Sequence, residues 1–296
     1  MEDFAARGKD VVCPAPDADP SPPTRYTMPA GAVDAHAHVI GPPPYNPERG
    51  YTPGAHPVVE YLGVLDACGF ASGVLVQPTV HGDDNSVMLA ALRAHPRRLR
   101  GVAVLPPTAS DRDVAALKDA GVVGLRLVAA ASGGKGLADL DRYEALCREA
   151  GWHLQLMVNG DRLGPAMAQL RALRVPVVID HLGYFPAHLG PDSTAARDIL
   201  SLLDAGAWLK LSGAFRVTRD PGYADSVPIA QTFIAAAPDR CVWGSDWPHV
   251  NFWSPMPCMG ALLDLLAQWA PDPAQRDRIL VDNPRRLYRF DEAGIA

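Results

Sequence analysis

The stretch Val33-Asp34-Ala35-His36-Ala37-His38-Val39-Ile40 decides how the rest of the chain is interpreted. Small or branched apolar residues alternate in it with polar ones, which predicts a β-strand with one wholly apolar face. The same alternation puts His36 and His38 together on the other face, about 7 Å apart along the strand. Two imidazoles on one face can converge on a point above the end of the strand.

Seven further apolar runs follow, separated by segments with helical spacing. We predict strands at residues 32–40, 72–78, 99–106, 122–129, 153–158, 175–183, 207–213 and 240–246. Strands rich in Val, Leu and Ile that alternate with helices are typical of a parallel sheet buried on both faces. Eight such units in about 260 residues predict an α/β fold, a single (β/α)8 TIM barrel. An open doubly wound sheet is the alternative, which the lack of a GxGxxG turn after the first strand disfavours.

The first 30 residues differ from the rest in composition. Residues 13–23 read CPAPDADPSPP and show no periodicity. Such a segment is expected to be extended on the surface or partly disordered. We therefore expect two parts, a Pro-rich N-terminal arm at residues 1–30 and the barrel at residues 31–296.

Composition limits the class of protein. The chain has 296 residues, of which 48% are hydrophobic and 20% charged, as in ordinary globular enzymes. Its net charge of -6 and the absence of a basic run argue against a nucleic-acid partner. The five cysteines form no CxxC pair, and no apolar run has the length of a signal core or a membrane span. We expect a cytoplasmic protein with no membrane partner, whose oligomeric state stays open.

Polar residues stand at the carboxyl ends of several predicted strands, where barrel enzymes carry their active sites. They are His36, His38, Thr79, Arg126, His181, Arg216, Asp246 and Asn251. Asp246 ends an apolar strand, where a carboxylate is costly unless it is paired or used. It could act as a general base on an attacking water, and the histidines could stabilise an oxyanion or hold a metal that does so. The two guanidinium groups suit bidentate capture of a carboxylate.

Four motifs in this order carry a resemblance to a known family. They are VDAHAHV at 33–39, DHLG at 180–183, LSGAFR at 211–216 and WGSDWPHVN at 243–251. Together they resemble the amidohydrolase superfamily of the amidohydrolase 2 type. They are most similar to the branch of 2-pyrone-4,6-dicarboxylate lactonase and related lactonases. The resemblance covers roughly residues 31–290.

The resemblance implies a hydrolase that opens a lactone of a small carboxylated molecule. Asp246 would activate water, while His36, His38 and His181 would stabilise the oxyanion and position the nucleophile. The residues expected to hold the substrate are Arg126, Arg216, Thr79, Tyr51 and Asn251. The chain departs from the dicarboxylate lactonase at Ser132 and Met157, where that enzyme looks to have an arginine and a tyrosine. We therefore expect a substrate with fewer carboxylates.

A metal is not required by this pattern. In the superfamily, a binuclear site needs a lysine at the end of strand 4, and a mononuclear site commonly adds a histidine at the end of strand 5. This chain has no lysine at the end of its fourth strand, and His153 lies at the start of its fifth strand. The sequence favours no required cofactor. If a divalent cation such as Zn²⁺ is present, its ligands would be His36, His38, His181 and Asp246.

The sequence leaves two other functions open. One is a metal-dependent non-oxidative decarboxylase, which the same superfamily contains. The other is a binding protein without catalytic activity on an enzyme barrel. The complete set of three histidines and one aspartate argues against the second.

Overall fold

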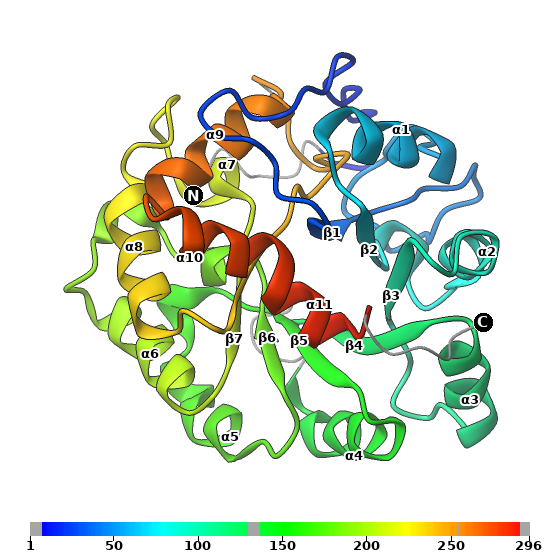
Figure 1. Ribbon diagram of the computed structural model, residues 1–296. Helices are drawn as coiled ribbons and strands as arrows, with labels where there is room; N and C mark the ends of the chain where they lie inside the picture. Colours follow the sequence, from blue (N-terminus) through cyan, green and yellow to red (C-terminus); the bar gives the residue numbers. More distant parts are fainter. Residues whose placement is uncertain (1–7, 130–136, 254, 291–296) are drawn as a thin grey trace.

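The computed structural model describes residues 8–129, 137–253 and 255–290. Eight parallel strands pair in sequence order (Figure 1). Their bounds are β1 Val33–Ala37, β2 Ser72–Val76, β3 Leu99–Ala103, β4 Val122–Val128, β5 His153–Met157, β6 Val177–Ile179, β7 Trp208–Leu211 and β8 Cys241–Trp243. A parallel bridge between Ala37 and Trp247 brings the chain after β8 back to β1, so the barrel is nearly closed. The predicted (β/α)8 barrel is confirmed, with strands shorter than expected.

Helices surround the barrel in Figure 1. They are α1 Val58–Cys68, α2 Ser86–Ala94, α3 Asp111–Asp119, α4 Leu140–Ala150, α5 Met167–Ala172, α6 Thr194–Asp204, α7 Ala214–Val217, α8 Ser226–Ala236, α9 Met259–Trp269, α10 Pro273–Asp277 and α11 Asn283–Tyr288. The left-handed glycines that follow α1 and α4, Gly69 and Gly151, end these helices as C-caps. Among the described residues, no helix is both long and apolar enough to cross a membrane.

The two faces of the strands pack into different cores. Val74, Val102 and Val242 meet inside the barrel, where Tyr288 of α11 joins them. The opposite faces, with residues such as Leu154, pack against the surrounding helices. Because the Tyr288 ring contacts the ring of His153, the first residue of β5, α11 covers the end of the barrel at which the strands begin. The site must therefore be sought at the other end.

Strand β1 departs from strict alternation. Ala35 belongs to the interior core and Ala37 to the outer one, although alternation would put both on one face. The pairing of β1 with β2 shifts register between Asp34 and Ala37, and such an irregularity re-aims side chains. The wholly apolar face predicted for this strand is therefore wrong. The shift turns Asp34 away from the interior, whereas His36 and His38 face the polar cluster described below.

Asp34 fastens β1 to the segment that follows β8. Its carboxylate accepts hydrogen bonds from the backbone N–H of Ser245 at 2.8 Å and from the Ser245 hydroxyl at 2.6 Å. It also accepts from the hydroxyl of Tyr61 on α1 at 3.1 Å and from the N–H of His36 at 3.2 Å. Burial nevertheless raises the pKa of Asp34 to about 6. These bonds fix β1, which carries His36 and ends directly before His38.

The described part of the N-terminal segment, residues 8–30, forms no helix or strand and lies against the barrel. The Thr24 hydroxyl and backbone N–H both donate to Asp264 of α9. Cys13 accepts a hydrogen bond from the backbone N–H of Asn251 at 3.4 Å. The division of the chain into an arm and a barrel at residue 30 stays a prediction.

Candidate active site

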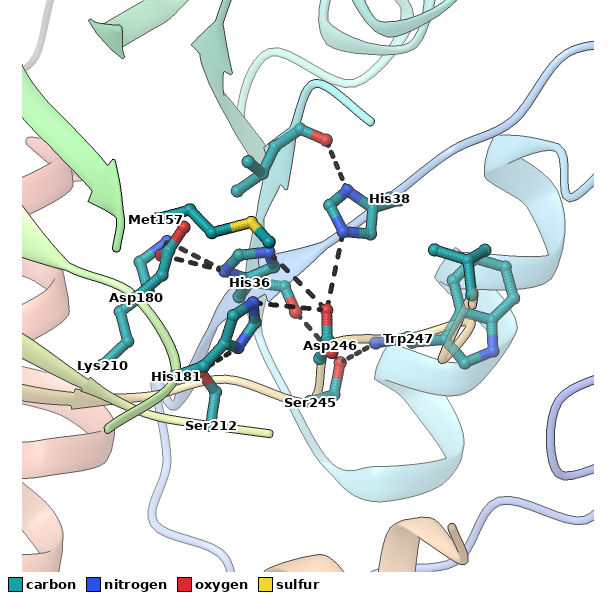
Figure 2. Close-up of polar contacts among 12 residues, drawn as sticks. His36, His38, Met157, Asp180, His181, Lys210, Ser212, Ser245, Asp246 and Trp247 are labelled. Carbon is teal, nitrogen blue, oxygen red and sulfur yellow. Dashed lines mark hydrogen bonds and ion pairs between the residues drawn. The ribbon is translucent and has the colours of Figure 1, made fainter. Parts of the chain in front are cut away.

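Asp246 is the centre of a polar cluster at the carboxyl ends of the strands (Figure 2). It is buried and has a φ of 61°, which is uncommon for a residue other than glycine. Its Oδ1 lies 3.5 Å from His38 Nε2, 3.7 Å from His36 Nε2 and 3.9 Å from His181 Nε2. The backbone N–H of Asp246 donates to the carbonyl of His36 at 2.8 Å, which fixes the carboxylate beside β1. The structure thus brings the four predicted catalytic residues together.

Arg216 holds the other oxygen of the same carboxylate. Its Nε donates to Asp246 Oδ2 at 2.5 Å, and its Nη2 donates to the carbonyl of Val250 at 2.9 Å. Burial alone would raise the pKa of Asp246, but the charge of Arg216 holds that pKa well below its usual range. Asp246 is therefore ionised near neutral pH, with Oδ1 facing the histidines.

Two of the histidines are oriented by neighbours at the ends of their strands. Nδ1 of His38 lies 2.7 Å from the carbonyl oxygen of Val76, the last residue of β2. Because a carbonyl only accepts, Nδ1 of His38 carries the proton, and in the neutral ring Nε2 presents a lone pair to the site. Nδ1 of His181 lies 2.9 Å from the hydroxyl oxygen of Ser212. Burial lowers the pKa of His181 to about 4, so this ring is neutral at pH 7.

His36 rests on a layer of polar side chains inside the barrel. Its Nδ1 lies 3.3 Å from Lys210 Nζ and 3.4 Å from Asp180 Oδ1. Lys210 also donates to Gln155 Oε1 at 2.7 Å, and Gln155 Nε2 donates to Asp180 Oδ2 at 3.0 Å. All four side chains are fully buried, and burial lowers the pKa of Lys210 to about 8. Sequence reasoning missed this layer, although Gln155 and Lys210 are polar residues within otherwise apolar strands.

Arg126 of β4 lies at the edge of that layer. Its Nε is 3.3 Å from Asp180 Oδ2, and its Nη1 donates to the carbonyl of Gln77 at 3.3 Å. Its Nη2 contacts the sulfur of Met157 at 3.4 Å. Both predicted carboxylate anchors, Arg126 and Arg216, are therefore already ion-paired with aspartates of the site.

A cavity of about 340 Å³ opens above the cluster. Every predicted site residue except His36 lines it; these are His38, Tyr51, Thr79, Arg126, His181, Arg216, Asp246 and Asn251. The Thr79 hydroxyl donates to the Tyr51 hydroxyl at 3.4 Å. The side-chain oxygen of Asn251 accepts no hydrogen bond from the described residues. His36 lies below the cavity, with its Nε2 3.7 Å from Oδ1 of Asp246, which does line the cavity.

Three polar lining residues were not predicted as ligands of the substrate. Tyr184 stacks edge-on against the ring of His181, with 5.2 Å between centroids, and burial raises its pKa to about 12. Its phenol therefore stays protonated and can donate a hydrogen bond. Glu48 and Arg49 line the cavity from the loop before α1. Of the two departures from the lactonase pattern, Met157 lines the cavity, whereas Ser132 lies outside the described residues.

The cluster has some features of a metal site. His36, His181 and Asp246 each offer one ligand atom, and these atoms lie within 4.8 Å of one another. His38 is not part of this group, although its Nε2 lies 3.5 Å from Asp246 Oδ1. The donor set fits a cation less well at His36, because a ligand needs its lone pair on Nε2 while the ammonium of Lys210 lies against Nδ1.

Comparisons with known proteins show the family and the relatives of this chain. Residues 33–290 match the sequence model of the family described as Amidohydrolase. The 4-sulfomuconolactone hydrolase of Hydrogenophaga intermedia is 37% identical over 276 residues, which cover 90% of this chain and 91% of that one. The 2-pyrone-4,6-dicarboxylate hydrolase of Comamonas testosteroni is 36% identical over 295 residues, covering 93% and 95%. A crystal structure from Acinetobacter baumannii, a probable 2-pyrone-4,6-dicarboxylic acid hydrolase with citric acid bound, has a TM-score of 0.79 at 30% identity. It covers 88% of this chain and 100% of its own.

Proposed function

The chain belongs to the amidohydrolase family, and from this premise we propose that it hydrolyses a lactone of a small molecule that carries a carboxylate or a similar acidic group. One observation carries the proposal. Oδ1 of an ionised, buried aspartate faces Nε2 of three histidines, beneath a cavity that two guanidinium groups line. The relatives named as lactone hydrolases support the same reaction.

In the proposed mechanism, Asp246 Oδ1 takes a proton from a water molecule as the water attacks the lactone carbonyl. The lone pair of His38 Nε2 accepts the other hydrogen of that water and orients it. His181 donates from Nε2 to the carbonyl oxygen as it becomes an oxyanion, which preorganised donors stabilise. His36, below the cavity, presents its Nε2 donor to Oδ1 of Asp246. The oxyanion then collapses and breaks the ring C–O bond. Asp246 returns its proton to the leaving alkoxide, so the product is the open hydroxy acid.

The substrate's acidic group would bind at the guanidinium groups of Arg126 and Arg216. Charge-assisted hydrogen bonds of this kind are the strong ones, and they give orientation as well as affinity. Tyr51, Thr79 and Asn251 contribute hydroxyl and amide groups to the lining of the same cavity. No cofactor enters these steps, and we propose that none is required.

A panel of lactones tests the proposal. Proton release should accompany opening of lactones that bear a carboxylate or sulfonate, and uncharged lactones of the same ring size should react more slowly. The product should be the hydroxy acid. Failure of every lactone in the panel would contradict the proposal. Release of CO₂ from a carboxylated substrate in a metal-dependent reaction would favour the decarboxylase alternative.

A further inference from the structure

His36 in β1 and His38, directly after β1, have different partners at their Nδ1 atoms. His38 Nδ1 faces a carbonyl oxygen, that of Val76, which can only accept. His36 Nδ1 faces the ammonium of Lys210 at 3.3 Å, which can only donate. Equivalent neighbours would give both rings the same tautomer, whereas these neighbours favour opposite ones.

Asp180 is the competing partner of His36. Its Oδ1 lies 3.4 Å from His36 Nδ1 and could accept a proton from it. Within the described residues, however, this oxygen has no hydrogen bond of good geometry, while the contact between Lys210 and His36 has one. The negative charge of Asp180 is also balanced without His36, since Arg126 Nε lies 3.3 Å away and Lys210 Nζ 3.6 Å away.

We infer that Lys210 is a positioning residue that fixes His36 in the tautomer with its proton on Nε2. His36 Nε2 has no hydrogen-bond partner among the described side chains and lies 3.7 Å from Asp246 Oδ1. In this tautomer it is an unused donor buried beneath the reaction centre. His38, with the opposite tautomer, is an acceptor there. The HxH motif therefore supplies one donor and one acceptor.

The same tautomer disfavours a metal at this site. A cation needs the lone pair of Nε2, and outer partners that set the tautomer commonly change metal affinity about 10–100-fold. Metal-ligating histidines usually donate their other N–H to an acceptor, as His38 does to Val76. Lys210 gives His36 the reverse arrangement. The catalytic meaning of this donor rests on the proposed lactone hydrolysis, but the tautomer itself does not.

Nitrogen NMR of the full chain with ¹⁵N-labelled histidine tests the inference. Long-range ¹H–¹⁵N spectra of chelator-treated protein distinguish protonated from unprotonated ring nitrogens, and the spectrum of the His36→Gln variant assigns the His36 signals. We expect Nε2 of His36 to be protonated and Nδ1 unprotonated. In Lys210→Met, the proton should move to Nδ1 and bond to Asp180. Lys118→Met, which removes an exposed lysine of α3, should leave the pattern unchanged.

Zinc binding gives a second measurement. Lys210→Met should bind Zn²⁺ about tenfold or more tightly than the wild type and Lys118→Met. A wild-type His36 protonated on Nδ1 would overturn the inference, whether or not the Lys210→Met variant folds. An unchanged tautomer in a folded Lys210→Met protein would also overturn it. A wild type with the expected tautomer that opens no lactone would contradict the proposed function and leave the inference standing.

Discussion

Arg216 Nε lies 2.5 Å from Oδ2 of Asp246, so the two oxygens of one buried carboxylate have different surroundings. Oδ2 is bound to a permanent cation, whereas Oδ1 faces the histidines. The ion pair keeps the carboxylate ionised and fixes its rotamer. Oδ1 is the oxygen that can act as a base, and predictions about activity and pH follow from this division.

Replacing the proposed base, Asp246, should strongly reduce turnover. Asp246→Asn keeps the shape of the side chain but cannot take a proton from water, and general-base catalysis is worth about 10²–10⁴-fold. We expect kcat/KM for a reactive lactone to fall by that factor, with an unchanged circular dichroism spectrum. Turnover at the wild-type rate would exclude Asp246 as the base.

Removing the cation beside the base should shift the pH profile. A base works in its ionised form, so activity is lost as the pH falls through its pKa. Arg216 holds the pKa of Asp246 well below its usual range, and Arg216→Gln should therefore move the acidic limb of kcat/KM to higher pH. An uncharged lactone is the substrate of choice, because it separates this effect from anchoring. Arg219→Gln, at an exposed position, serves as the control. If the acidic limb of Arg216→Gln coincides with that of the wild type, Arg216 does not lower the pKa of the base.

Arg126 should act on binding more than on chemistry. A hydrogen bond to a charged group is worth about 1.5–3 kcal/mol, or about 10–150-fold in affinity. Arg126→Gln should raise KM for a carboxylated lactone by that order, with a smaller effect on an uncharged one. The exposed Arg112→Gln is the matched control. Equal losses on charged and uncharged lactones would argue against a carboxylate anchor.

Chelation should leave the reaction intact. The proposed steps use only side chains, so extensive dialysis against a chelator should change kcat/KM by less than about twofold, metal content being measured in parallel. Loss of activity that Zn²⁺ restores would show that the proposed cofactor-free mechanism is wrong.

Asp34 should make the protein less stable as the pH rises through a defined window. The folded chain keeps the proton of Asp34 up to about pH 6, whereas an unfolded chain loses it near pH 3.9. Between these values the folded state binds more protons, so the contribution of Asp34 to the free energy of unfolding falls, by roughly 3 kcal/mol at most. Denaturant titrations at pH 4 and pH 7 should therefore show the wild type losing stability relative to Asp34→Asn. The exposed Asp119→Asn variant is the control. A wild type that gains stability relative to Asp34→Asn as the pH rises would contradict the raised pKa of Asp34.

The barrel could be predicted because its signals are local. Each strand is an apolar run, each helix has its own spacing, and the polar residues at the strand ends identify the open end of the barrel. The register shift in β1 could not be predicted in this way. It depends on how β1 pairs with β2, and no residue between Asp34 and Ala37 is unusual for a regular strand.

The layer under His36 was missed for a different reason. Gln155 and Lys210 come from β5 and β7, and Asp180 directly follows β6. They meet only because the register of the barrel brings the three strands together. A polar residue within an apolar strand indicates an interior position but does not name its partner. The pairing of Arg216 with Asp246 was equally hidden, because both residues follow their strands and their rotamers decide the contact.

The contacts of the N-terminal segment imply an order of assembly. Thr24 bonds to Asp264 and Cys13 to Asn251, partners that lie 240 and 238 residues further along the chain. During synthesis these two contacts must wait until nearly all of the barrel has been translated. Asn251 lines the cavity, so one wall of the cavity gains its support only at that late stage. A nascent chain can therefore build most of its barrel well before it can hold a substrate.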